Sequence, residues 1–231
     1  MDTNRLQTLD RGMLALQIVA QAPRGISVAD LARELDVARA AAYRIVATLE
    51  DHAMLHRDGT GRIRLGSGTL VLAAQFDTGL RGIARPIVEK LAAKTQATAF
   101  VSVAHGRQCT AILTVESDRP FINIAYRAGV RHPLDRGAAG IAILAGRPEA
   151  AEDSDEIREA RRLGYSLTRG QLQPGAVGVS SPVPLSPDLH PGLECSIGVV
   201  AMEDLDVANA AQAAMRAAGE LAALMGHGLR R

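Results

Sequence analysis

Residues 27–66 read SVADLARELDVARAAAYRIVATLEDHAMLHRDGTGRIRLG, and this stretch decides the fold of the N-terminal part of the chain. Apolar residues recur at helical spacing over residues 27–35, and Ser27 stands at the expected N-cap position, three residues before Asp30. Residues 36–37 interrupt the pattern, and a second helical repeat covers residues 38–54. A polar turn at 58–61 then separates two short segments, which predicts a β-hairpin.

A helix, a short turn, a second helix and a hairpin, in this order, indicate a winged helix-turn-helix. The second helix has a suitable size for the major groove of DNA, with Arg39, Tyr43 and Arg44 on its polar side. Two short amphipathic helices can also be a packing unit without a binding role. The arginines around the hairpin turn favour DNA binding, because they are placed to contact phosphate: Arg57, Arg62 and Arg64.

The composition of the 231 residues limits the other possibilities. Apolar residues make up 47% and aromatic residues only 3%, so the core must consist of Ala, Leu, Ile and Val. The net charge of +1 does not indicate a nucleic-acid-binding protein, and a DNA-binding face must come from local clustering. No apolar run has the roughly 20 residues of a membrane helix, and the N-terminus has no secretion signal. Cys109 and Cys195 lack metal-ligand spacing. We expect a cytoplasmic protein with no metal and no cofactor.

Segments on both sides of residues 27–66 complete the expected organisation. A helix over residues 6–22 should complete a three-helix core, with Leu6, Leu9 and Met13 among its apolar positions. An apolar helix over 69–77 should pack against a partner subunit, because it is too apolar to stand alone in water. A further helix reaches residue 95, and Pro86 inside it predicts a kink or a late start.

From residue 98 the period changes to that of β-strands, around a turn at 105–107. This second part is expected to be α+β, with a mostly antiparallel sheet and helices to one side. The expected domains are a winged helix-turn-helix over 1–66, a linker helix over 67–78, and an effector-binding and oligomerisation domain over 79–231. The other elements expected are strands at 98–103, 109–115, 120–127, 177–185 and 193–202, an extended segment at 165–168, loops at 129–134 and 170–178, helices at 137–146 and 153–163, and a helix at 205–225 with Gly226 at C′.

Four stretches, in order, carry a resemblance to a known family. They are LDRGMLALQIV at 9–19, VARAAAYRIVATLEDHAML at 37–55, GVRHPLDRGAAGIAILAG at 129–146 and GYSLTRGQLQPGAVGVSSPV at 164–183. With them the chain resembles the IclR family of bacterial transcriptional regulators. The resemblance implies a C-terminal effector domain of GAF-like fold and a homodimer, or a dimer of dimers, on a palindromic double-stranded DNA operator. It also implies repression or activation controlled by a small metabolite, frequently an organic acid or an aromatic compound.

The DNA-contacting positions of the family fall here on the second helix and the hairpin. Small hydroxyl residues are usual where this chain has Ala40 and Ala41, and alanine can only touch a thymine methyl group. Affinity should then depend on the arginines of the second helix and the hairpin, although Arg44 could instead pair with an acidic residue at position 50 or 51. The expected DNA-binding residues are Arg39, Ala40, Ala41, Tyr43, Arg44, Arg57, Arg62 and Arg64.

The effector positions of the family fall on a small-residue segment and on the last strands. Where acid-sensing members carry Asp, Cys and Ser, this chain has poorer hydrogen-bonding groups, so we expect a larger, apolar or aromatic ligand. A carboxylate would have mainly the backbone N–H groups at the start of the helix from residue 138. Alternatively, residues 137–140 are small only because helix and sheet approach closely. The expected effector-binding residues are Ala138, Ala139, Thr168, Gly178, Gly198 and Val200.

Enzymatic chemistry has little support in the sequence. His105 and Cys109 are four residues apart, but they flank a tight hairpin and lack a third, orienting residue. We therefore expect a regulator rather than an enzyme. The alternative is a metabolite-binding or enzymatic α+β domain whose N-terminal helices mediate protein contact, and such a module would not need the arginine-bearing hairpin.

Overall fold

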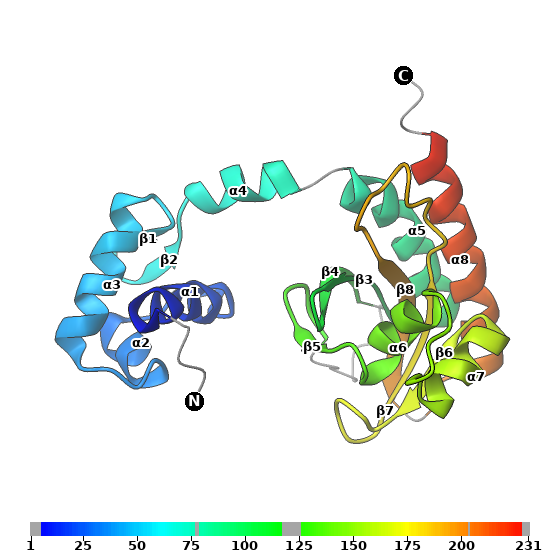
Figure 1. Cartoon of the computed structure of the whole chain (residues 1–231). Coiled ribbons are helices and arrows are strands. Elements are labelled where there is room, and N and C mark those ends of the chain that lie inside the picture. The colour runs from blue at the N-terminus through cyan, green and yellow to red at the C-terminus, as the bar shows by residue number, and fades with distance from the viewer. Residues whose placement is uncertain (1–5, 77–78, 117–125, 203, 228–231) are drawn as a thin grey trace. The chain divides into compact units, whose positions relative to one another are not determined.

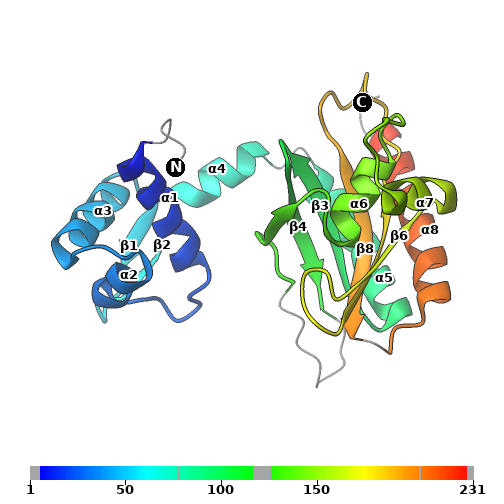
Figure 2. The same ribbon diagram turned by 60° about the horizontal axis from the view of Figure 1, so that its bottom comes forward.

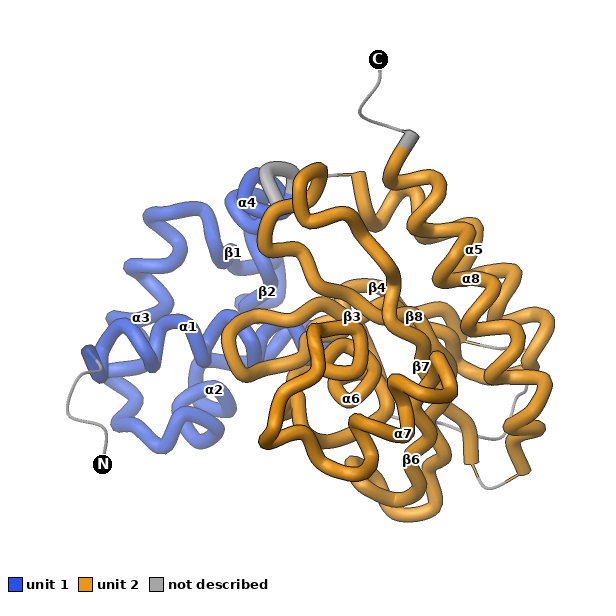
Figure 3. Tube along the Cα trace, turned by 45° about the vertical axis from the view of Figure 1, so that its right-hand side comes forward, with its two compact units in different colours: residues 1–78 blue, residues 79–231 orange. Residues whose placement is uncertain are grey.

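The computed structural model describes residues 6–76, 79–116, 126–202 and 204–227. The chain divides into two compact units, residues 1–78 and residues 79–231 (Figure 3). The separate linker domain expected at 67–78 stays a prediction, because its helix belongs to the first unit in this division.

The first unit is a winged helix-turn-helix (Figure 1). Its elements are α1 (Gln7–Ala20), α2 (Val28–Glu34), α3 (Arg39–Asp51), β1 (Leu55–Arg57), β2 (Ile63–Leu65) and α4 (Gly68–Phe76). The first three helices and the antiparallel hairpin enclose one core, as the sequence predicted. The fully enclosed residues of this core include Ala15, Leu31, Ala42, Val46, Leu55 and Ile63.

Local chemistry fixes the ends of α2. The Ser27 hydroxyl accepts a hydrogen bond from the Asp30 amide at 3.1 Å and donates one to the Asp30 carboxylate at 2.7 Å, as expected for an N-cap. At the other end, Asp36 takes a left-handed conformation with φ of 50°. Aspartate tolerates this conformation better than most residues, so the chain can turn sharply into α3.

The apolar face of α1 differs from the prediction. Ala15 and Val19 are buried, whereas Leu6, Leu9 and Met13 are 75, 61 and 53% exposed. The core of the unit reaches only the C-terminal half of the helix, so its N-terminal half keeps an exposed apolar surface. Helix α4 also has an exposed apolar surface, which includes three successive residues: Leu70, Val71 and Leu72.

The second unit is α+β, as predicted. Over its described residues, six strands form one antiparallel sheet in the order β5-β4-β3-β8-β7-β6. The strands are β3 (Thr98–His105), β4 (Gln108–Val115), β5 (Arg131–Pro133), β6 (Ser166–Arg169), β7 (Ala176–Pro182) and β8 (Cys195–Met202). The helices are α5 (Leu80–Thr95), α6 (Gly137–Ala145), α7 (Asp155–Leu163) and α8 (Val207–His227).

The helices cover both faces of this sheet, so the expectation of helices to one side was wrong (Figure 2). Alternate residues of β3 point to opposite faces. Ala99 and Val101 pack with α5 and α8, whereas Phe100 packs with Ala139 and Ile143 of α6. Both faces of the strand are apolar in the sequence, and a two-sided core follows.

Smaller differences concern the ends of elements. Residues 131–133, expected in a loop, form β5 and pair with β4. Helix α5 begins at Leu80, so Pro86 lies inside it and the late start was wrong. Gly226 lies within α8 rather than after it. The strand expected at 120–127 falls largely outside the described residues. Among those residues, no helix combines the length and apolar character that crossing a membrane requires.

Candidate functional site

The outer surface of α3 is the first candidate site. Ala42 and Val46 anchor the helix in the core, which turns the opposite side outward. Arg39, Ala40 and Arg44 are exposed, Ala41 is half-buried, and Tyr43 is 53% exposed. Within the described part of the chain, neither Arg39 nor Arg44 forms an ion pair. The helix therefore presents two uncompensated guanidinium groups to solvent.

The three hairpin arginines differ from those of α3, because each has an intramolecular partner. Arg57 donates to Glu50 of α3 at 3.3 Å and lies over the ring of Tyr43, with 5.7 Å from its Cζ to the ring centroid. Arg62 donates to the carbonyl oxygen of Gly25 at 2.8 Å, and Arg64 donates to that of Pro23 at 3.0 Å. These contacts fasten the hairpin to α3 and to the loop before α2.

Asp58 organises the hairpin turn. Its carboxylate accepts hydrogen bonds from the Thr60 hydroxyl at 2.6 Å, the Thr60 amide at 2.9 Å and the Arg64 guanidinium at 2.9 Å. The bond from the Thr60 side chain, followed by that from Arg64, holds the pKa of Asp58 well below its usual range. Arg64 is therefore committed to the turn as well as to the loop before α2.

The second candidate site is a cavity of about 210 Å³ in the C-terminal unit. It lies where one face of the sheet meets α6 and the loop between β6 and β7. Five of the six positions expected to bind an effector line it: Ala138, Ala139, Thr168, Gly178 and Val200. Gly198 is not among the lining residues, and a Cβ there would overlap the carbonyl oxygen of Val179 on the neighbouring strand. Its glycine serves the close packing of β8 on β7.

Several lining residues were not expected from the sequence. They are Phe100, Tyr126, Val130, Arg131, His132, Gln171, Leu172, Gln173 and Ala176. Arg131 and His132 stand inside one of the four stretches that carry the family resemblance, and their place in that stretch was a usable signal. Phe100 gave none, because an aromatic residue in an apolar strand also fits an ordinary core.

Three buried polar side chains meet at one side of the cavity, and two of them, Tyr126 and His132, line it. His132 Nδ1 donates to the carbonyl oxygen of Pro133 at 2.9 Å, so the other ring nitrogen is free to accept. The Tyr126 hydroxyl lies 3.4 Å from that Nε2 atom and 3.1 Å from the Ser102 hydroxyl. Burial lowers the pKa of His132 and raises that of Tyr126. Burial thus favours the neutral forms of the His132 imidazole and the Tyr126 phenol.

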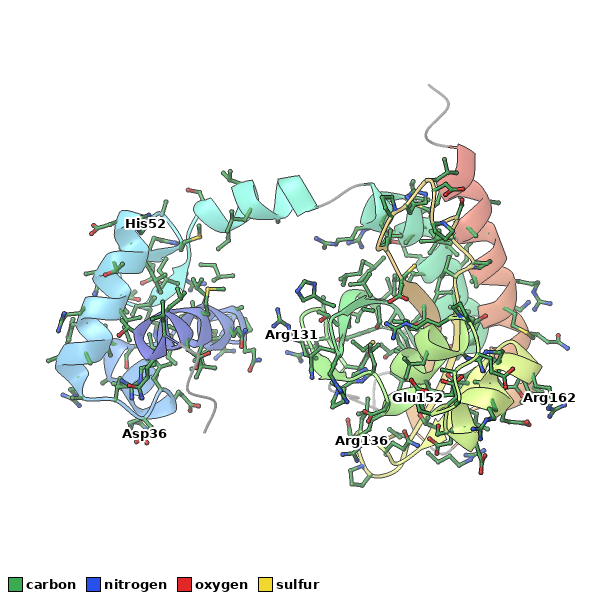
Figure 4. The ribbon with its side chains drawn as sticks, viewed as in Figure 1. Asp36, His52, Arg131, Arg136, Glu152 and Arg162 are labelled. Atoms are coloured by element: carbon green, nitrogen blue, oxygen red, sulfur yellow. The ribbon has the colours of Figure 1, made fainter. Side chains whose placement is uncertain are left out.

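The start of α6 forms another part of the cavity wall. The Gly137 amide donates to the side-chain oxygen of Gln171 at 2.8 Å, and the Gln171 amide nitrogen donates to Glu156 at 2.9 Å. The first N–H of the helix is thus already occupied by the chain itself. A Cβ at Gly178 would lie 3.1 Å from the Ala138 Cβ, so this glycine allows β7 to approach α6 closely beside the cavity. Figure 4 marks Arg131 on β5 and Arg136 just before α6.

Neither cysteine lies in the setting of an activated nucleophile. In the hairpin of β3 and β4, His105 pairs with Gln108 and Cys109 with Ala104, so His105 and Cys109 are not partners. Cys109 and Cys195 are both buried, and burial raises the pKa of each thiol to about 12. In the described ranges, no three His, Cys, Asp or Glu side chains gather in a way that could hold a metal ion.

Two family models match most of the described part of the N-terminal unit and the first half of the C-terminal unit. The family model of the IclR helix-turn-helix domain matches residues 8–59, and that of the bacterial transcriptional regulator IclR C-terminal domain matches residues 73–154. The chain belongs to the IclR family. The first IclR model covers most of α1, the helices α2 and α3, and the start of the hairpin. The second covers α5, the strands β3, β4 and β5, and α6. Members of this family are transcriptional regulators with a DNA-binding helix-turn-helix and an effector domain.

Individual IclR-type relatives are distant. The probable regulator ArcR of Halobacterium salinarum is 31% identical over 57% of this chain and 51% of its own length. The regulator BhcR of Paracoccus denitrificans is 23% identical over 95% of this chain and 88% of its own length. The chain thus spans about half the length of the first relative and most of the second.

A solved structure shares the fold. An IclR homologue from Microbacterium hydrocarbonoxydans, complexed with 4-hydroxybenzoate, aligns with a TM-score of 0.74 at 18% identity, over 95% of this chain and 99% of that one. At this identity the likeness concerns the fold, and the ligand is a property of that homologue.

Proposed function

We propose that this chain is a cytoplasmic, sequence-specific DNA-binding transcriptional regulator, a repressor or an activator, and not an enzyme. The observation that carries the proposal is the outer surface of α3, with Arg39 and Arg44 exposed and uncompensated on a helix sized for the major groove. In this proposal the two arginines supply most of the base and phosphate contacts. Ala40 and Ala41 supply apolar contact with thymine methyl groups, and Tyr43 adds a phenol.

The cavity of the C-terminal unit is the proposed effector site. About 150 Å³ of apolar cavity is enough to hold benzene, so 210 Å³ has room for one ring with substituents. Phe100, Val130, Leu172 and Val200 offer apolar contact, and Arg131 at the wall offers a charge for an acidic substituent. The homologue that holds 4-hydroxybenzoate is consistent with this class of ligand. We therefore propose a monocyclic aromatic effector.

The assembly proposed is a homodimer, or a dimer of dimers, on a palindromic operator. Its support is the exposed apolar surface of α1 and of α4, which a single chain leaves in water. A symmetric contact through such a surface would give two copies of α3, as a palindromic site requires.

A mobility-shift assay on the DNA upstream of the gene tests the function directly. Specific binding should weaken steeply between 50 and 200 mM salt, with a log–log slope of about −0.9 for each phosphate neutralised. Competition with unrelated DNA separates specific from general binding. A folded protein that shows no sequence-specific shift, with or without metabolite extract, would refute the proposal.

The effector class has its own test. Isothermal titration with a panel of substituted benzoates and a panel of simple keto acids should give binding only with the first panel. The ligands that bind should also change the mobility shift. Tight binding of a keto acid with no binding of benzoates would exclude the aromatic class and leave the DNA-binding function untouched.

A further inference from the structure

One hairpin arginine is folded onto the proposed recognition helix. Arg57 extends from β1 across the outer surface of α3, where its guanidinium lies over the ring of Tyr43 and pairs with Glu50. The distance of 5.7 Å from its Cζ to the ring centroid is within the range of a cation–π contact. Arg62 and Arg64 have no such contact with α3, because they bind the loop at residues 23–25.

The sequence of α3 makes room for this arrangement. Tyr43, Ala47 and Glu50 follow one another at helical spacing, so they share one stripe of the helix surface. The short side chain of Ala47 stands between the two residues that Arg57 contacts. A longer residue at position 47 would compete with the guanidinium for this place.

The charge of Arg57 is also compensated. Its Nε lies 3.2 Å from Glu50 Oε1 and 3.3 Å from Oε2, with the two side chains 36 and 27% exposed. A guanidinium paired in this way has less charge to offer to a phosphate than those of Arg39 and Arg44, which have no such partner. Tyr43 remains 53% exposed beside it.

We propose that Arg57 is a positioning residue for DNA recognition: it holds the Tyr43 ring in one orientation on α3, and the phenol makes the DNA contact. Arg57 itself neutralises no phosphate. An exposed tyrosine without a neighbour would lose rotamer freedom on binding, and a ring already held by a guanidinium loses less. The inference rests on the proposed DNA-binding function and assigns separate roles to the arginines of α3 and of the hairpin.

A double-mutant cycle tests this assignment with the full-length protein and the labelled operator from the mobility-shift assay. The variants are Arg57→Gln, Tyr43→Ala and the pair together, with affinity measured by fluorescence anisotropy at four salt concentrations. Arg57→Gln should weaken specific binding about two- to fivefold, as expected for loss of one exposed contact, and leave the salt slope unchanged. In the Tyr43→Ala background the same change should have almost no further effect.

Arg39→Ala is the matched control, because Arg39 is the first residue of the same helix and forms no ion pair among the described residues. We expect Arg39 to neutralise one phosphate, so its loss should make the salt slope shallower by about 0.9. Thermal unfolding of each variant checks that the first unit remains folded. The side chains at 39, 43 and 57 are all exposed, so little change is expected.

Each other outcome overturns the inference. A salt slope that becomes shallower by about 0.9 in Arg57→Gln would mean that Arg57 binds phosphate directly. Weakening that persists in full after Tyr43→Ala would mean that it acts independently of the ring, and no weakening at all would mean that it has no role. Absence of specific binding by the wild-type protein would refute the proposed function instead, so the two failures are distinguishable.

Discussion

The outer surface of α3 and the cavity of the C-terminal unit are built in opposite ways. The residues on α3 come from one 13-residue helix, and their spacing alone puts them on one side. The cavity draws on five strands, one helix and two loops, and its lining residues span positions 100–200. A binding surface on one element can thus be predicted from local periodicity, whereas an enclosed site depends on which elements the fold brings together.

The hairpin arginines show the limit of local periodicity even within the first unit. Arg44 and Arg64 are the same residue type, and both stood among the expected DNA-binding residues. Arg64 is held by Asp58 and the Pro23 carbonyl, whereas no ion pair was found for Arg44 in the described residues. Residue type places a charge on a segment, and the partner decides whether that charge is available to DNA.

The largest effect expected is from Leu31→Ala. This change tests whether the first unit can lose stability without a loss of effector binding in the second. Leu31 is fully buried in the core of the first unit. Its truncation should lower the free energy of unfolding of that unit by about 2–5 kcal/mol, through lost contacts and a cavity. Urea unfolding followed by circular dichroism measures the loss, and titration of an aromatic effector should show unchanged binding.

The control for this prediction is Leu65→Ala, in the hairpin of the same unit. Leu65 is 38% exposed, so a smaller loss of stability is expected, below about 1.5 kcal/mol. If Leu31→Ala removes effector binding together with stability, the two units do not behave separately.

Arg44→Ala tests whether operator binding can be lost from the surface of α3 without a change in the cavity. Its loss should remove one arginine–base contact, for which about 1–3 kcal/mol of discrimination is typical, so the shift should vanish at the wild-type protein concentration. Effector affinity in the cavity should stay the same by calorimetry. Arg33→Ala is the control, because Arg33 is exposed on α2 and already pairs with Asp30. A shift that persists in Arg44→Ala would exclude this arginine from recognition.

Val200→Phe is the corresponding change in the cavity. The larger ring should fill part of the 210 Å³ and lower the affinity for a monocyclic aromatic ligand at least about tenfold. Operator binding without ligand should be unchanged. Leu167→Phe adds the same ring at a residue of β6 that is 41% exposed and outside the lining, and it should leave ligand affinity unaltered. Equal losses in both variants would contradict the site.

The smallest effect expected concerns pH and the hairpin turn. The pKa of Asp58 is lowered in the folded protein, chiefly by the Thr60 hydroxyl and then by Arg64. Its contribution to stability is therefore complete above the ordinary value of 3.8 and is lost as pH falls below it. Asp58→Asn should reduce the steepness of acid unfolding of the first unit between about pH 4 and pH 2.

This pH prediction is checked by urea unfolding at several pH values. Asp51→Asn, at the exposed end of α3, serves as the control and should follow the wild type. An unchanged acid dependence in Asp58→Asn would mean that the charge of the Asp58 carboxylate contributes nothing to the stability of the unit.

Much of the fold was predictable from the sequence because local signals are strong in this chain. Ser27 and Asp36 mark the ends of α2, and Gly106 lies in the turn between β3 and β4 with φ of 59°, where the sequence predicted a hairpin. The cavity was partly predictable, since the small residues at 138 and 139 and Gly178 belong to stretches that resemble the family. Phe100 and Tyr126 were not, because an aromatic residue in a strand fits a core as well as a binding site.

The sequence by itself determined the winged helix-turn-helix, the α+β class of the second unit, and the polar side of α3. These follow from periodicity and end signals, which act between residues close in the chain. The tertiary structure alone decided which arginines are paired, that helices cover both faces of the sheet, and which side chains enclose the cavity. Those features depend on contacts such as Arg62 with Gly25 and Gln171 with Gly137, between residues more than 30 positions apart. The hydrogen-bonding capacity of each side chain is written in the sequence, but its partner is set only when the elements pack.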